Sequence, residues 1–260
     1  MSVLVLSDAT FVLDPGAYFG IVPREIWSRQ FQADERGKVR LSTNLLLVES
    51  GGVHTLIDTG IGPWMGEKML GIYGVQGLGT LTGRLRSMGV RIDRVLLSHM
   101  HFDHAGNIYS EELIHSTVVV QRRERYAFSR TNELTRGSYL SHLASVRRVS
   151  VIEGSSNLGG GIRAVHTGGH TVGHQAFFIE SGGREIIYAG DLFPSSFHVR
   201  PGYITAIDVE PLVSLTVKKK IIRHAIRRGS IMVFNHDPST PTAVLTGDEE
   251  RPKVEAVSIE

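Results

Sequence analysis

Residues 98–107 read SHMHFDHAGN, which places His99, His101, Asp103 and His104 within six positions, directly after a short apolar run that predicts a β-strand. Side chains two apart in an extended chain share a face, so the first three can project together, with His104 on the turn that follows. Imidazole and carboxylate groups are both ligands of zinc. A solvated polar loop is the alternative, but four such groups without a nearby counter-charge favour a metal site.

The composition limits the classes of protein to consider. The chain has 260 residues, 12 histidines and no cysteine, with 28 Lys and Arg against 26 Asp and Glu. The lack of cysteine excludes disulfides, Cys-based zinc fingers, iron–sulfur clusters and cysteine nucleophiles. A formal net charge of +2 gives no reason to expect a nucleic-acid partner.

The sequence gives no sign of a targeting or membrane-spanning segment. Residues 1–13 lack a basic region and a small-residue cleavage site, so they predict a strand rather than a signal peptide. No stretch approaches the ~20 apolar residues that span a bilayer. We therefore expect a cytoplasmic protein that does not bind a membrane.

Short apolar and β-branched runs alternate with helical patterns along the chain, which predicts an α/β fold with layered sheets. We expect helices at 80–88 and 213–228, the second ending before Gly229, and a single domain over 1–260. Residues 122–148 are polar, charged and aromatic and predict a helical lid or insertion, and the polar tail 240–260 is expected to fray. The predicted strands are 45–49, 53–58, 94–98, 117–121, 146–152, 161–166, 175–180, 184–190 and 231–235.

Further ligand-type residues follow later predicted strands. His170 and His174 lie in the glycine-rich segment GGHTVGH, Asp191 follows Ala189-Gly190, and His236 follows Asn235. Each signal is weak by itself, because an Asp at a strand end is usually a turn former. Together they place His, Asp and His at three successive strand ends after the dense motif.

This ordered set resembles the metallo-β-lactamase superfamily. The matching motifs are H-x-H-x-D-H at 99–104, G-G-H at 168–170, G-D at 190–191 and a late histidine, preceded by D-T-G at 58–60. The resemblance implies an αββα sandwich of two facing mixed β-sheets flanked by helices, with metals at one edge of the sheets.

The resemblance also implies how the metals are held. His99, His101 and His170 would bind one divalent ion, Asp103, His104 and His236 a second, and Asp191 would bridge the two. Zinc is the expected metal, with iron, manganese or cobalt as alternatives. A metal-bridged hydroxide would attack a carbonyl or phosphoryl centre, Asp103 would carry a proton to the leaving group, and Asp58 and His174 would lie behind the ligands.

Two further stretches, 18–27 and 189–198, resemble acyl-homoserine lactonases and methyl-parathion-type hydrolases. This branch implies quorum-quenching hydrolysis of a small lactone or related ester, with phosphotriester hydrolysis as a side activity and a homodimer as an open alternative. Some lactonases carry a Tyr where this chain has Pro194, so His198 is offered as a polar group at the pocket mouth. The expected pocket residues, for each of which core packing is the alternative, are Phe19, Trp27, Trp64, Phe193 and Phe197.

Other functions remain open at this point. A glyoxalase-II-like thioesterase is weakened because no basic glutathione-binding region follows His236. A binding protein that keeps the metals but has lost turnover is a second alternative. An iron redox enzyme is a third, although flavodiiron proteins place a Glu where this chain has His101.

Overall fold

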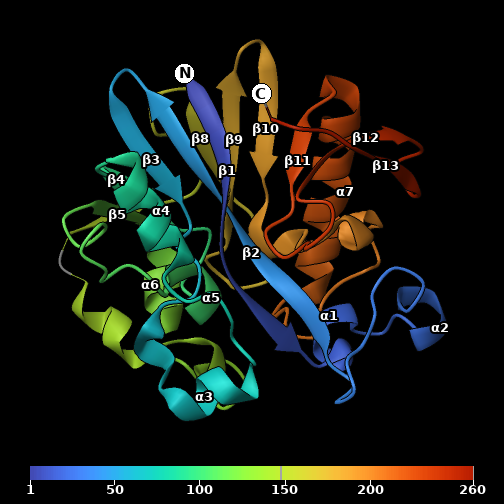
Figure 1. The fold of residues 1–260 in the computed structure, drawn as a ribbon. Helices are drawn as coiled ribbons and strands as arrows, with labels where there is room; N and C mark the ends of the chain where they lie inside the picture. The colour runs from blue at the N-terminus through green and yellow to red at the C-terminus, as the bar shows by residue number, and fades with distance from the viewer. Residues whose placement is uncertain (147, 260) are drawn as a thin grey trace.

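A computed structural model describes residues 1–146 and 148–259, the side chain of residue 142 excepted. It contains two mixed β-sheets (Figure 1). The six-stranded sheet has the order β1 (Ser2–Leu13), β2 (Val39–Ser50), β3 (Val53–Ile57), β4 (Arg94–Leu96), β5 (Thr117–Gln121) and β6 (Val149–Ile152). The seven-stranded sheet has the order β13 (Pro252–Ala256), β12 (Thr242–Gly247), β11 (Ile231–Val233), β10 (Arg184–Tyr188), β9 (Gln175–Ser181), β8 (Ile162–His166) and β7 (Ser156–Asn157). All ten strands expected from the sequence, including the one at residues 1–13, are present.

The sheets face each other because their strands alternate between two apolar layers. In β2, Leu46 and Val48 face the second sheet and pack with residues such as Phe177 and Tyr188. Leu45 and Leu47 of the same strand point to the opposite layer. Because successive side chains point to opposite faces, this continuous apolar run makes both faces of the strand apolar, as expected for a strand that is covered on both sides.

Two longer helices cover the outer faces of the sheets (Figure 1). Helix α4 (Thr80–Met88) buries Leu81 and Leu85 against the first sheet. Helix α7 (Pro211–Arg228) buries Ile221 and Ile222 against the second and ends at Gly229, whose φ of 62° makes the expected left-handed C-cap. The predicted αββα sandwich is confirmed.

The remaining helices are short. The α-helices are α1 (Pro15–Phe19), α2 (Arg24–Trp27), α3 (Glu67–Ile72), α5 (Phe102–Ala105) and α6 (Arg122–Phe128). The 3-10 helices are η1 (Pro63–Met65), η2 (Arg136–Ser138), η3 (Ser141–Ser145), η4 (Gly190–Leu192) and η5 (Ser196–Val199). Within the described residues, no helix combines the length and apolar character needed to cross a membrane.

Two sequence-based expectations differ from the structure. The described part of the segment 240–260 is not a frayed tail, because β12 and β13 form one edge of the second sheet and Leu245 is buried in its outer layer. In the described part of the segment 122–148, seven residues form α-helix, in α6, and turns and two 3-10 helices follow. Both segments contain many exposed polar residues, so the few buried positions at which they pack could not be recognised from the sequence.

Strand direction determines where the site can form. Strands β3 and β4 are parallel, as are β10 and β11, so the residues that follow each pair emerge at one edge of their sheet. At this edge the Asn44 side chain donates to the Phe234 carbonyl at 2.9 Å, and the Tyr188 hydroxyl donates to Asp58 at 2.9 Å. These bonds hold the two sheets together where the candidate ligands follow.

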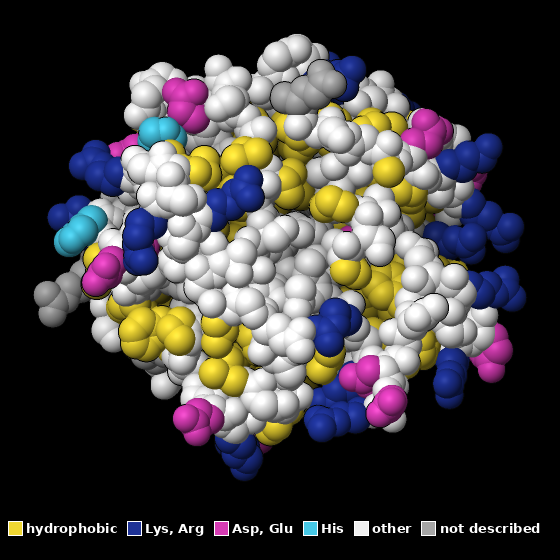
Figure 2. All heavy atoms as spheres, viewed as in Figure 1, with side chains coloured by type: hydrophobic (Ala, Val, Ile, Leu, Met, Phe, Trp, Pro, Cys, Tyr) yellow, Lys and Arg dark blue, Asp and Glu magenta, His cyan; other side chains and the backbone are white. Residues whose placement is uncertain are grey.

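Charged side chains are mixed on the face shown in Figure 2. Lys and Arg lie among Asp and Glu around the margin, and the middle carries mainly uncharged groups. This distribution agrees with a formal net charge of only +2.

Candidate metal centre

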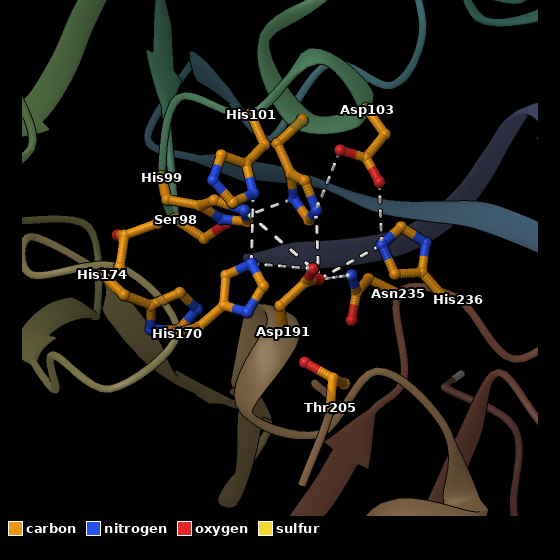
Figure 3. A network of polar contacts seen from close by, with 12 residues as sticks. Ser98, His99, His101, Asp103, His170, His174, Asp191, Thr205, Asn235 and His236 are labelled. Carbon is orange, nitrogen blue, oxygen red and sulfur yellow. Dashed lines mark hydrogen bonds and ion pairs between the residues drawn. The ribbon is translucent and has the colours of Figure 1, made fainter. Parts of the chain in front are cut away.

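Two groups of buried ligand-type side chains meet at the shared edge of the sheets (Figure 3). The first contains His99, His101 and His170. The second contains Asp103, His104, Asp191 and His236. Within each group the potential ligand atoms all lie within 4.8 Å of one another. The structure thus brings together all seven residues that the family resemblance named.

Asp191 lies between the two groups, and its carboxylate oxygens face different ones (Figure 3). Its Oδ2 is 3.3 Å from His170 Nε2 and 4.0 Å from His99 Nε2. Its Oδ1 is 3.1 Å from His104 Nε2 and 3.2 Å from His236 Nε2. Asn235 also donates to Oδ1, at 2.5 Å. One carboxylate is therefore placed to serve two cations.

The donor geometry fits divalent cations. Tetrahedral ligands at about 2.0–2.1 Å from zinc lie about 3.3–3.4 Å from one another. His236 Nε2 is 3.3 Å from Asp103 Oδ2, and His101 Nδ1 is 3.1 Å from His170 Nε2. The buried Nε2 atoms of His99, His104 and His236 form no hydrogen bond of good geometry, although carboxylate oxygens lie near them. Since unpaired buried nitrogens are costly, a cation that accepts their lone pairs accounts for the arrangement.

Each candidate histidine ligand except His101 is also held from behind through its other ring nitrogen. Such bonds fix the tautomer and the ring orientation of a metal ligand. The Nδ1 contacts are His99 to Ser98 Oγ at 3.0 Å, His104 to Asp58 Oδ2 at 2.7 Å, His170 to Asp208 Oδ1 at 2.9 Å and His236 to the Ser42 carbonyl at 2.8 Å.

Asp58 is the centre of one such network. It accepts hydrogen bonds from the Ser98 amide and hydroxyl, both at 2.7 Å, as well as contacting His104. Its φ of 57° is the only positive value among the described non-glycine residues. A left-handed conformation costs energy for a residue with a Cβ, and the bonds to this carboxylate stabilise it. Asp58 thus lies behind a candidate ligand, where the sequence placed it.

The candidate histidine ligands differ in electrostatics. Burial holds the pKa of His99 well below its usual range and lowers that of His101 to about 3, so both rings are neutral and able to bind a cation. Burial acts in the same direction on His170 and His236, but nearby carboxylates oppose it: Asp191 and Asp208 raise the pKa of His170, and Asp191 and Asp103 raise that of His236 to about 9. The surroundings of the Asp191 carboxylate therefore favour positive charge in both groups.

His174 and His198 lie outside both groups. His174 Nδ1 is 2.6 Å from Thr167 Oγ1, within its own loop. The expectation for His198 at the pocket mouth is not met, because the side chain is fully buried. Its Nδ1 contacts Ser195 Oγ at 2.8 Å and its Nε2 the Tyr18 carbonyl at 2.9 Å, which leaves no ring nitrogen for a substrate.

A cavity of about 530 Å³ opens beside the first group of ligands and reaches His101 and Asp208. Its walls come from three segments: 126–139, 171–172 and 206–209. Several of the wall residues are apolar and exposed, and Leu134 is 92% exposed. The apolar lining residues are Tyr126, Ala127, Leu134, Tyr139, Val172, Ala206, Ile207 and Val209.

The five aromatic residues expected to line the pocket are not among those that line this cavity. Phe19, Trp27 and Phe197 are buried in one apolar cluster, where Phe19 stacks on Trp27 with ring centroids 5.0 Å apart. Phe193 is buried beneath α7, and Trp64 is half exposed and packs edge-on against the Tyr109 ring. Aromatic side chains that bury one another gain more apolar contact than a solvent-lined wall offers, so core packing is the better interpretation for the four buried rings, but not for Trp64.

Two residues that contact the candidate ligands or their loops were not found from the sequence. Asp208 holds His170, and its partner lies 38 positions away in the chain. Glu124 is fully buried within an otherwise exposed run of arginines and contacts both histidine loops of the first group. Neither belongs to a motif, and an isolated carboxylate in a polar stretch gives no signal that distinguishes it from a solvated one.

Comparison with known proteins agrees with this geometry. A sequence model of the metallo-β-lactamase superfamily matches residues 39–236, a range that contains all seven candidate ligands. The chain belongs to the metallo-β-lactamase superfamily. The match begins with β2 and ends at His236.

Within the superfamily, the chain is similar to lactonases over part of its length. An N-acyl homoserine lactonase from Bacillus sp is 36% identical over 87 residues, which cover 34% of this chain and 32% of that protein. The lactamase-like protein adaB from Aspergillus niger is 31% identical over 156 residues, 60% of this chain and 40% of that protein. The matched part thus spans less than half of the length of these curated relatives.

Solved structures resemble the whole chain. A probable metal-dependent hydrolase from Staphylococcus aureus has a TM-score of 0.89 and 29% identity, covering 98% of this chain and 96% of that one. A quorum-quenching N-acyl homoserine lactone lactonase has a TM-score of 0.74 at 20% identity, with 92% and 94% coverage, and shows a shared fold.

Proposed function

We propose that this protein is a hydrolase that uses two divalent cations, zinc in the first place, to cleave a small lactone or related ester. The observation that carries the proposal is the position of Asp191, whose two oxygens face two separate groups of buried ligands. The similarity to lactonases over a third of the chain supports this choice of substrate.

The chain's own residues would perform two tasks beside holding the cations. Asp58 and Asp208 fix the rings of His104 and His170 in the orientation that presents Nε2 to a cation. When bound, such cations would supply Lewis-acid chemistry, which polarises a carbonyl or phosphoryl oxygen and lowers the pKa of water. Asp103, whose Oδ1 lies 3.9 Å from His104 Nε2, is ionised because His104 and His236 lower its pKa, so it can accept a proton and pass it to the leaving alkoxide.

The cavity supports an ester with an apolar part. Its volume of about 530 Å³ lies within the range of small-molecule sites, and its walls combine apolar side chains with the ligand His101 at one end. An acyl-tailed lactone, an aryl ester or an aryl phosphotriester fits this description. Quorum quenching by cleavage of acyl-homoserine lactones is the biological role that we infer from the lactonase relatives.

Elemental analysis combined with a substrate panel tests the proposal. We expect two equivalents of divalent metal per chain, and highest kcat/KM on acyl-homoserine lactones among lactones, aryl esters, phosphotriesters and S-lactoylglutathione. Metal-replete protein that is inactive across this panel would overturn the proposal, and tight binding of an acyl-tailed lactone without product would favour a binding protein.

Two expectations from the sequence also bear on function. We propose a cytoplasmic location, where the protein would meet substrates that enter the cell. We also propose a homodimer, which sedimentation or size-exclusion measurements of the purified protein would test.

A further inference from the structure

Glu124 is the one buried residue in an exposed charged stretch. It lies in α6 and is fully buried, whereas Arg122, Arg123 and Arg125 are exposed. A buried carboxylate without charge pairing is costly unless its oxygens accept hydrogen bonds. Burial accordingly raises the pKa of Glu124, although the groups that donate to it act in the opposite direction. The role of Glu124 therefore depends on the groups that donate hydrogen bonds to it.

Three donors from three segments converge on this carboxylate. Its Oε1 accepts from the Met100 amide at 2.9 Å and from the Tyr139 hydroxyl at 3.1 Å. Its Oε2 accepts from the Thr171 hydroxyl at 2.6 Å. Three such bonds to one charged acceptor are strong and set its orientation completely.

The first and third donors belong to the loops of the first ligand group. Met100 lies between His99 and His101, and Thr171 directly follows His170. The loop that carries Thr171 also approaches α6 closely, because a Cβ added at Gly173 would lie only 2.1 Å from the Glu124 amide nitrogen.

The second donor belongs to the wall of the cavity. The Tyr139 ring lines it and packs edge-on against His101, with centroids 4.9 Å apart. The backbones of these two residues also form an isolated antiparallel bridge. One carboxylate thus connects the wall to both histidine loops.

We propose that Glu124 is a positioning residue that fixes the cavity wall to the loops carrying His99, His101 and His170. The apolar part of a bound substrate lies against the wall, and its scissile bond lies at the metal ligands. Glu124 therefore sets the distance between the two, and through it the preference for substrate size. The selectivity part of this inference rests on the proposed hydrolase function, whereas the connection itself does not.

A matched pair of variants tests the connection. Glu185 is also buried, and it accepts side-chain bonds from His224 and Ser230, both at 2.6 Å, at the start of β10. We expect Glu124→Ala to speed amide exchange by about 10- to 100-fold in residues 99–101, 136–141 and 168–173, as the loss of charged hydrogen bonds predicts. Glu185→Ala should leave these segments unchanged.

Tyr139→Phe removes only the bond between Glu124 and the wall. It should speed exchange in 136–141 alone, leave metal content at the wild-type value and change the ratio of kcat/KM between long-acyl and short-acyl substrates mainly through KM. It also keeps the proposal testable if Glu124→Ala fails to fold. Glu124→Gln, which retains one acceptor oxygen, should give an intermediate exchange profile.

The outcomes separate the two proposals. Equal exchange profiles for the Glu124 and Glu185 variants, or an unchanged profile and substrate ratio in Tyr139→Phe, would overturn the positioning role. Local exchange that changes as expected in a protein without hydrolase activity would support the connection and overturn the proposed function instead.

Discussion

The candidate metal ligands and the cavity wall differ in how the chain holds them. The candidate ligands lie in loops and short helices that follow strand ends, and all seven are buried. Four of the five histidines among them are also fixed through their second ring nitrogen. The wall consists of α6, turns, a 3-10 helix and the loop 206–209, with exposed apolar side chains. The difference indicates that the sheets supply a rigid site for the chemistry, while irregular segments of lower packing supply selectivity.

The largest expected effect comes from the residue that both ligand groups share. Asp191→Asn removes the charge between two cations, and we expect loss of at least one metal equivalent and a decrease in kcat/KM of about 10³-fold or more, since metals contribute several kcal/mol to such reactions. Metal analysis and steady-state kinetics measure both.

Asp8→Asn is the control for that variant. Asp8 is equally buried and accepts bonds from the amides of Ile61 and Leu81, but it belongs to neither ligand group. It should lose stability and keep both metals. If Asp191→Asn retained two metals and full activity, the ligand assignment would be wrong.

A smaller effect on metal binding is expected from a residue that does not bind the cation but orients a candidate ligand. Asp208→Asn weakens the bond that orients His170, so we expect metal affinity to decrease by about 10- to 100-fold. Competition with a chromophoric chelator measures this affinity. Asp248→Asn, at an exposed turn where the carboxylate accepts only backbone bonds, should not change it.

The same contrast explains which parts of the fold and of the candidate site could be predicted from the sequence. The ligand motifs are local, because a strand end fixes the spacing of neighbouring side chains. They predicted the fold, which is confirmed, and the seven candidate ligands that the structure brings together. Asp208 and Glu124 act on partners 38 and 47 positions away, which only the folded chain brings near. Strands β12 and β13 were missed because β12 has only six residues and β13, at the edge of the sheet, has no buried residue. Phe19, Trp27, Phe193 and Phe197 were expected in the substrate pocket but are buried, because the sequence does not tell whether a ring packs on a ligand or on another ring.

A third effect concerns the support of the wall. Lys218 of α7 is buried, donates to the Tyr203 carbonyl at 2.5 Å at the base of the 206–209 loop, and lies over the Phe193 ring. Burial lowers its pKa to about 7, although Asp208 acts in the opposite direction. The unfolded chain, with a lysine pKa near 10.4, binds more protons, so wild-type stability should rise as the pH increases from about 7 to about 10.

Lys218→Met tests that dependence. We expect it to raise the free energy of unfolding by on the order of 1–3 kcal/mol at pH 7 or below, because it removes a buried charge. The gain should vanish as the pH rises above about 10.4, where the lysine becomes neutral in both states. Chemical denaturation at several pH values measures it, and Lys220→Met, at an exposed position of the same helix, should show no such trend.

The smallest effect separates the wall from the N-terminal stretch that the resemblance favoured. Leu134 and Ile21 are both 92% exposed, but only Leu134 lines the cavity beside His101. Replacing either with Ser should leave stability and metal content unchanged. Leu134→Ser should raise KM about two- to fivefold for long-acyl substrates, the loss of part of one apolar contact, with kcat unchanged. Ile21→Ser should not change KM. The reverse result, with Ile21→Ser raising KM alone, would place the substrate against residues 18–27 and return selectivity to the aromatic cluster beneath them.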